Sequence, residues 1–123
     1  MVIDGKKYKY RMHHQDFHCS VDVTMRCIGG KWKAVVIWYL RKGKKRFGEL
    51  KARIPDITDK MLSIQLKALE EDGLLTRKVY AQVPPKVEYE LTEEGNSLIP
   101  LVESIAKWGR QKVEKEGRLV IDE

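Results

Sequence analysis

Residues 47 to 91 constrain the fold more than any other part of the sequence. Two segments with apolar residues at helical spacing are separated by Pro55, which predicts two short helices joined by a tight turn. Two runs rich in Val, Tyr and Thr follow, and the loop between them contains Pro84 and Pro85. These runs predict two strands with a stiff connection. The order therefore predicts a helix-turn-helix followed by an antiparallel ribbon, which we call the wing.

The second helix of this motif is predicted over residues 58 to 72. Thr58 is a favourable N-cap, and Asp72 with Gly73 marks the end of the helix. A narrow apolar stripe follows one side of the helix and comprises Leu62, Leu66 and Leu69. With that stripe buried, a rotation of about 100° per residue places a different set on the opposite face. This set comprises Lys60, Ser63, Ile64 and Lys67.

The outward face of the second helix has side chains that suit duplex DNA. Lysine donates to guanine acceptors or phosphates, serine bonds to either, and an exposed apolar side chain can contact a thymine methyl group. Ile64 has little structural reason to lie opposite the stripe, although it could also pack on a neighbouring element or stand alone in solvent. We predict that this helix enters the major groove, with contacts from Thr58, Lys60, Ser63, Ile64 and Lys67.

Positive charge is concentrated beside this motif. The net charge is +6, and residues 31 to 53 hold nine lysines and arginines against one acid, Glu49. Such a patch is expected of a polyanion binder, although a solvated lysine-rich surface is common in soluble proteins. The wing, at about residues 75 to 91, is expected on the DNA backbone or in the minor groove. The charges of the wing, which fix position rather than read sequence, are Arg77, Lys78 and Lys86. Lys44 and Lys45 lie in the loop before the first helix of the motif, where they could contact phosphates or simply be solvated.

The rest of the chain divides into an arm, a domain and a tail. Residues 1 to 18 are basic and without periodicity, which predicts an arm ordered only by packing on a partner. Residues 19 to 113 are expected to form one DNA-binding domain, and residues 114 to 123 a frayed, charged tail. No segment approaches the roughly 20 apolar residues of a membrane span, and no signal peptide is evident. A cytoplasmic protein without membrane contact is therefore expected.

Three further helices are predicted in the domain. Ser20 is expected to cap the first, which ends at Gly29 and Gly30. Thr92 is expected to cap a single long last helix, kinked by Pro100. The helix between them begins near residue 31 and shows one apolar face, formed by Trp32, Val35, Val36, Tyr39 and Leu40.

The cysteines and histidines indicate neither a metal site nor a catalytic centre. Cys19 and Cys27 are expected to be thiols, and on one helix they would be too far apart to bridge. His13, His14 and His18 could bind a metal weakly, but a solvated arm explains them better. A thiol enzyme built on Cys19 would need a base and a pocket, and beyond the adjacent His18 no orienting group is evident. We therefore predict no enzyme, no metal and no cofactor.

From residue 19 to residue 109, a series of short motifs resembles the HxlR-type winged helix-turn-helix transcriptional regulators of bacteria, relatives of the MarR group. Each motif is weak alone, but their order is highly specific. Ser20 and Thr58-Asp59 depart from residues common in the family, yet they still suit the start of a helix. The matching segments are Cys19-Ser20-Val21-Asp22, Ile28-Gly29-Gly30-Lys31-Trp32, Arg46-Phe47-Gly48-Glu49-Leu50, Ile57-Thr58-Asp59-Lys60-Met61-Leu62-Ser63, Leu69-Glu70-Glu71-Asp72-Gly73-Leu74, Val79-Tyr80, Val83-Pro84-Pro85-Lys86-Val87-Glu88-Tyr89, Leu91-Thr92-Glu93-Glu94-Gly95 and Trp108-Gly109.

The resemblance implies an α+β, mainly helical fold with a two- to three-stranded antiparallel wing and a C-terminal dimerisation helix. It implies a homodimer on a near-palindromic operator in double-stranded DNA. The dimer contacts are expected from Leu101, Ile105 and Trp108, although the apolar face of the last helix could equally complete the core of a monomer. Cys19 matches a cysteine with which several members sense oxidants or electrophiles, and its place before a helix favours a thiolate. An inert, half-buried cysteine is the alternative, and the effector, oxidant or small molecule, is not identified by the sequence.

Two functions compete for this fold. The leading hypothesis is a sequence-specific transcription regulator, because the outward face of the second helix is basic. The alternative is a winged-helix module that binds protein through the last helix and the wing, since fold alone does not decide function. An acidic or apolar outward face would have favoured the second hypothesis.

Overall fold

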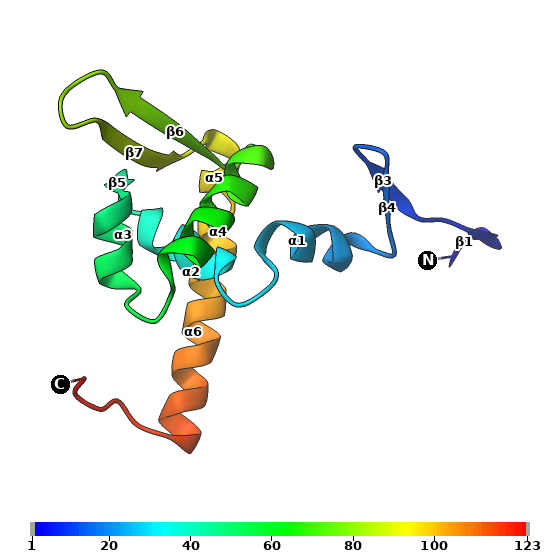
Figure 1. The fold of residues 1–123 in the computed structure, drawn as a ribbon. Helices are drawn as coiled ribbons and strands as arrows, with labels where there is room; N and C mark the ends of the chain where they lie inside the picture. Colours follow the sequence, from blue (N-terminus) through cyan, green and yellow to red (C-terminus); the bar gives the residue numbers. More distant parts are fainter. Residues whose placement is uncertain (1, 123) are drawn as a thin grey trace.

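The computed structural model describes residues 2–122. Helices α2 (Lys33–Leu40), α3 (Phe47–Arg53) and α4 (Asp59–Glu71) form a body from which three parts project. Figure 1 shows the wing on one side of this body, the N-terminal segment on the other, and α6 (Ile99–Glu116) extending away from both. None of the helices in the described part of the chain is both long and apolar enough to cross a membrane.

Helix α2 lies at the centre of the hydrophobic core. It packs against α4, against α6 and against β7 of the wing (Lys86–Leu91). Val36, Ile37 and Leu40 are buried, whereas three of the five residues predicted for its apolar face, Trp32, Val35 and Tyr39, are only half-buried. The prediction of one apolar face was therefore too narrow. A helix with neighbours on several sides buries more than one stripe, so it shows no clean amphipathic pattern.

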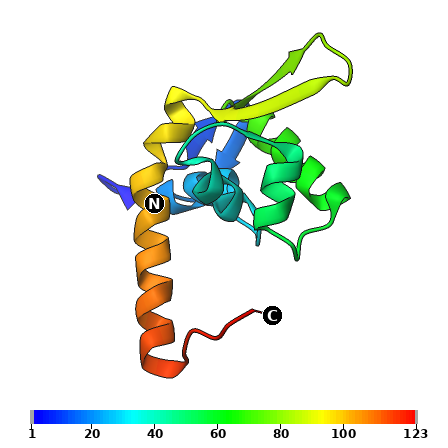
Figure 2. The ribbon, with the colours of Figure 1, turned by 90° about the vertical axis from the view of Figure 1, so that its left-hand side faces the viewer.

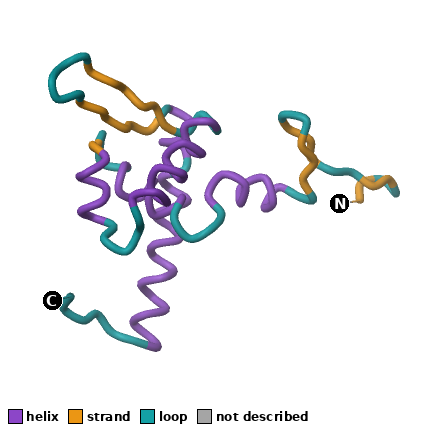
Figure 3. Tube along the Cα trace, viewed as in Figure 1, coloured by secondary structure: helices purple, strands orange, loops and turns teal. Residues whose placement is uncertain are grey.

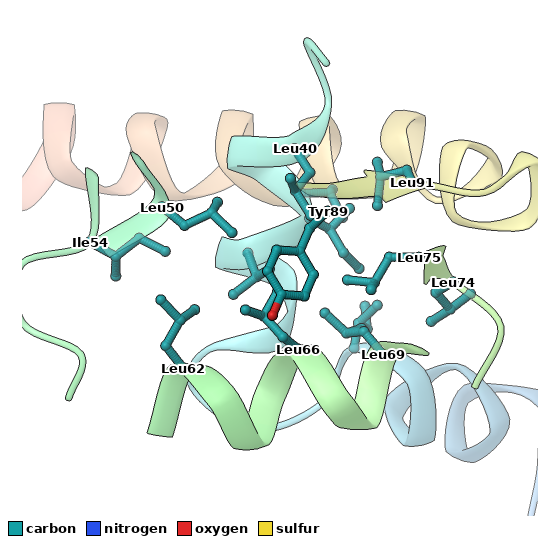
Figure 4. Packing of buried hydrophobic residues seen from close by; sticks show 14 of the residues in the cluster. Leu40, Leu50, Ile54, Leu62, Leu66, Leu69, Leu74, Leu75, Tyr89 and Leu91 are labelled. Atoms are coloured by element: carbon teal, nitrogen blue, oxygen red, sulfur yellow. The ribbon is translucent and has the colours of Figure 1, made fainter. Parts of the chain in front are cut away.

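The helix-turn-helix forms as predicted. Leu50 of α3, Ile54 after it and Ile57 in the turn are buried against the stripe of α4. Figure 4 shows Leu62, Leu66 and Leu69 pointing from α4 into this core. The Thr58 hydroxyl accepts a hydrogen bond from the Met61 backbone N–H at 3.0 Å, which confirms Thr58 as the N-cap.

The wing is a three-stranded antiparallel sheet in the order β5–β7–β6, as the predicted fold class requires. Strand β6 (Leu75–Tyr80) pairs with β7 along its whole length, and the two-residue strand β5 (Lys45–Arg46) pairs with the other edge of β7. Leu75, Tyr89 and Leu91 are buried and fasten the base of the wing to the core (Figure 4).

The C-terminal region contains two helices where one kinked helix was expected. Helix α5 (Glu93–Ser97) begins at Thr92, whose hydroxyl accepts from the Gly95 backbone N–H at 3.1 Å. Leu98 ends α5 and caps α6. Pro100 lies in the first turn of α6, where its missing N–H costs no hydrogen bond, so this proline begins a helix instead of bending one.

The N-terminal segment is folded into two hairpins, which corrects the prediction of an irregular arm. The first pairs β1 (Val2–Ile3) with β2 (Lys6–Lys7), and the second pairs β3 (Tyr10–Met12) with β4 (Gln15–Phe17). The turn residues Asp4, Gly5, His13 and His14 all have positive φ. An Asp-Gly pair is a strong hairpin signal, so the first turn could have been predicted from the sequence. Below, the N-terminal hairpins are residues 2–17.

Helix α1 (Ser20–Ile28) connects the N-terminal hairpins to the body. Its N-cap is Cys19 rather than Ser20, which is the first helical residue. The Cys19 side chain makes no capping hydrogen bond, and the Asp22 carboxylate in the first turn accepts one from the His18 backbone N–H at 2.9 Å. Gly29 ends the helix, as predicted.

Candidate nucleic-acid interface

The outward face of α4 presents the predicted set of side chains together. Lys60, Ser63 and Lys67 are exposed, and Ile64 is 47% exposed while the stripe beneath it is fully buried. The alternative in which Ile64 packs on a neighbouring element is therefore not what the structure shows. Such a face can offer ammonium and hydroxyl donors and one apolar contact to the edges of base pairs.

Two residues modify this picture of α4. The hydroxyl of Thr58 is already used to cap the helix, so it reaches a phosphate only by sharing that oxygen. Met61 is 37% exposed beside Lys60, and its sulfur accepts from the Gln65 side-chain amide at 3.2 Å. The helical projection missed Met61 because it treated apolar residues beside the stripe as core.

Two of the lysines predicted to contact phosphates, Lys44 and Lys86, lie beside one carboxylate. The Nζ of Lys44 lies 3.6 Å from Oε1 of Glu88, and the Nζ of Lys86 lies 3.7 Å from Oε2. Lys78 is opposite Glu88 in the strand register. The Nζ atoms of Lys78 and Lys86 also lie 4.8 and 4.9 Å from the centre of the Tyr80 ring. We call these residues the wing cluster: Lys44, Lys78, Tyr80, Lys86 and Glu88.

Glu88 is a residue that the sequence reasoning overlooked. Its side chain is only 11% exposed, and the Tyr80 hydroxyl, followed by Lys44 and Lys86, holds the pKa of its carboxyl below the ordinary value. The wing cluster therefore contains a permanent negative charge among its lysines at neutral pH. The signal was present in the sequence, since cross-strand neighbours of a lysine in a hairpin are often acids.

The remaining two predicted phosphate-contacting residues lie apart from the wing cluster. Arg77 and Lys45 are both opposite Tyr89 in the strand register, so their side chains leave the sheet on the face that Tyr89 shares. Arg77 is exposed and Lys45 half-buried. The alternation of side chains across a strand thus divides the predicted phosphate contacts between the two faces of the ribbon.

An apolar surface runs along α6, away from the wing. Leu101, Ile105 and Trp108 are 39, 46 and 66% exposed, which leaves the three predicted dimer contacts accessible. A groove of about 270 Å³ lies along the line where α6 packs against α2. Val35, Trp38, Tyr39, Val102 and Ile105 are among the residues that line it. Figure 2 shows that the second half of α6 extends beyond the other helices of residues 2–122.

The two cysteines occupy different environments on α1. Both are free thiols and half-buried, with Cys19 at the N-cap and Cys27 near the C-terminal end, where it packs against the core. Burial, assisted by the charges of Asp72 and Glu94, raises the pKa of the Cys27 thiol. Within residues 2–122, no group of three or more His, Cys, Asp or Glu side chains is arranged to hold a metal ion.

Known proteins with similar sequences and folds are regulators. The HxlR-like helix-turn-helix family matches residues 27–117. The HTH-type transcriptional regulator YtcD of Bacillus subtilis is 48% identical over 104 residues, which are 85% of this chain and 82% of YtcD.

Solved structures show the same similarity. The redox regulator HypR, in its oxidized form, has a TM-score of 0.74 and 47% identity, covering 83% of this chain and 100% of the HypR chain. The reduced form of the transcriptional regulator YodB from B. subtilis has a TM-score of 0.66 and 35% identity, covering 76% and 92% of the two chains.

Proposed function

The protein belongs to the HxlR-like helix-turn-helix family, and we propose that it binds operator DNA sequence-specifically as a homodimer. The named relatives are transcriptional regulators, so the chain is a regulator of helix-turn-helix type and not an enzyme. The observation that carries the proposal is the exposed face of α4. There Lys60, Ile64 and Lys67 stand over a fully buried leucine stripe, so nothing in the core requires them.

In this proposal the helix and the wing have different tasks. Helix α4 enters the major groove and reads base edges, while the wing cluster and Arg77 contact phosphates and fix the register. The alternative function, a protein-binding winged helix, is disfavoured because the face of α4 carries exposed lysines and no acidic residue between Lys60 and Lys67. A homodimer would place two copies of α4 in successive major grooves of a near-palindrome.

Fluorescence anisotropy on DNA from upstream of the protein's own gene tests sequence-specific binding. At about 150 mM salt, where non-specific binding is weak, the wild type should bind this DNA far more tightly than a scrambled duplex. Lys60→Ala with Lys67→Ala should lower the affinity by at least about thirtyfold, since each of the two base contacts contributes about 1–3 kcal/mol. Lys112→Ala with Lys115→Ala, near the far end of α6, removes the same charge and is the control. Equal affinity of the wild type for both duplexes would refute the proposal.

We also propose that Cys19 responds to oxidants or electrophiles. Its N-cap position places the sulfur at the positive end of the α1 dipole, and two similar structures are of proteins described as a redox regulator and a regulator in reduced form. Diamide or hypochlorite should change the DNA affinity of the wild type and of Cys27→Ser, but not that of Cys19→Ser. A response that survives in Cys19→Ser removes this thiol from the mechanism.

A further inference from the structure

An exposed aliphatic run follows α6. Leu119, Val120 and Ile121 are 86, 74 and 86% exposed, and residues 117–122, which we call the C-terminal segment, form no regular structure (Figure 3). Single exposed aliphatic residues are ordinary, but three in succession with high strand propensity make a contact surface without a partner. Arg118 precedes the run and Asp122 follows it directly, so the aliphatic residues lie between a positive and a negative side chain.

A cleft of matching character lies between the N-terminal hairpins. Its volume is about 480 Å³, and Val2, Tyr8 and Phe17 form its apolar wall. Lys7, Lys9, Asp16 and His18 also line it. Lys9 lies 3.7 Å from Asp16, whereas Lys7 takes part in none of the ion pairs among residues 2–122. The cleft therefore combines apolar surface, which suits the aliphatic run, with the unpaired ammonium group of Lys7, which suits the carboxylate of Asp122.

The N-terminal hairpins have little strand pairing and little contact with the rest of the chain to stabilise them. Their strands are two or three residues long, and isolated hairpins of this size are marginal in water. Each pairs with only one other strand, so each keeps a free edge of backbone donors and acceptors. Only β4 makes more than slight contact with the body, through α1. An added strand would supply the missing pairing and burial.

We propose that the C-terminal segment of one copy docks in the cleft between the N-terminal hairpins of a second copy. The two regions leave the body on opposite sides (Figures 1 and 2), which separates them within one chain. The aliphatic run contacts Val2 and Tyr8, and Asp122 pairs with Lys7. By two-fold symmetry the exchange occurs twice, and it extends the α6 contact of the proposed homodimer, on which this inference rests.

Mixing two defective variants tests whether the contact joins two chains. One variant is Val2→Ser with Tyr8→Ser, and the other carries Leu119→Ser, Val120→Ser and Ile121→Ser. Neither homodimer has an unmutated C-terminal segment opposite an unmutated cleft. The heterodimer has one such pair. Native mass spectrometry of the equilibrated mixture should therefore show heterodimer above its statistical share. A purely statistical distribution would overturn the proposal, as would an enrichment that persists when Arg118→Ser replaces the second variant.

Sedimentation and hydrogen exchange separate this inference from the homodimer itself. The triple serine variant should raise the dimer dissociation constant by at least about tenfold, the effect of one well-buried aliphatic side chain, and should deprotect residues 2–17. If the triple serine variant changed neither the dimer dissociation constant nor the hydrogen exchange of residues 2–17, the docking would be refuted. The homodimer itself would still stand. A wild type that stays monomeric at all concentrations would refute the homodimer and this inference together.

The proposed ion pair between Lys7 and Asp122 can be tested by exchanging the two charges. Lys7→Glu and Asp122→Lys should each weaken the dimer, and the double variant should recover part of the loss, since paired charges are coupled. Loss of operator affinity in Lys7→Glu, with the dimer constant unchanged, would instead assign the N-terminal hairpins to DNA and overturn the proposal.

Discussion

Glu88 is the single residue that most alters what the wing can do. Its carboxylate lies within 3.6 and 3.7 Å of the ammonium groups of Lys44 and Lys86, two side chains expected to contact phosphates. The Tyr80 hydroxyl and these lysines keep the pKa of Glu88 low, so the negative charge persists throughout the neutral range. Every phosphate that approaches the wing cluster therefore also meets a fixed anion.

Removing this charge should strengthen DNA binding. Glu88→Gln leaves Lys44 and Lys86 free for phosphates, so the affinity for any duplex should rise severalfold. The salt dependence should also steepen, by about 0.9 in the slope of log K against log salt for each added phosphate contact. Salt titrations by anisotropy measure both quantities. Glu90→Gln, an exposed change on the same strand, is the control, and an equal effect there would contradict this role of Glu88.

Cys27 should react with alkylating agents only at unusually high pH. Burial raises the pKa of its thiol. The thiolate, which is the form that attacks iodoacetamide, therefore appears at a higher pH than in an ordinary cysteine. In a Cys19→Ser background, the alkylation rate should stay low through neutral pH and increase only above the usual range for a thiol. In urea, the unfolded protein should be alkylated at the pH that is usual for a free cysteine. A folded protein that reacts like a free thiol at neutral pH would contradict the burial argument.

At the scale of single elements, the structure depends on how closely α5 approaches the strands. Gly95 is buried in α5, and a Cβ at that position would overlap the backbone carbonyl oxygen of Leu74. The same region holds the Thr92 cap, whose hydroxyl donates to the Gly73 carbonyl at 2.6 Å. The close packing of α5 therefore links the end of α4, both long strands of the wing and the start of α6.

Gly95→Ala should destabilise the fold. The methyl group meets backbone rather than a movable side chain, so a loss of roughly 1–3 kcal/mol is expected. Thermal unfolding should then occur several degrees lower, at about 4–8 °C for each kcal/mol in a domain of this size. Gly48→Ala in α3 is the matched control, because a Cβ there has no neighbour within 4 Å. The control should gain stability, and a similar loss in both variants would contradict the steric explanation.

For the whole molecule, the unpartnered surface of α6 predicts how the chain associates. Ile105→Ser with Trp108→Ser should raise the dimer dissociation constant by about a hundredfold, the effect expected when central apolar contacts are lost. Sedimentation equilibrium measures this change. Glu103→Ser, on another face of α6, should leave association unchanged. A double variant that remains as dimeric as the wild type would place the dimer contact elsewhere.

Local sequence patterns predicted the elements that pack against the core on one side only. The stripe of Leu62, Leu66 and Leu69 faces one core, so its period identified α4 and its outward residues. The caps Thr58 and Thr92 act through hydrogen bonds within three residues, which a sequence shows directly. Helix α2 was less predictable, since Ile37 is buried by neighbours distant in the sequence. The Asp4-Gly5 turn is also encoded locally, since an Asp-Gly pair favours the positive φ values that both residues adopt.

The sequence by itself determined the helix-turn-helix, the strand pair that follows it and the side chains on the outward face of α4. These follow from periodicity and capping, which act within a few residues. Only the tertiary structure decided that Lys44 of a distant loop joins Glu88 in the wing cluster, or that Arg77 lies on the other face of the ribbon. It alone also placed the N-terminal hairpins and the C-terminal segment on opposite sides of the body (Figure 1). Such placements depend on packing between residues far apart in the chain, and a local pattern does not encode them.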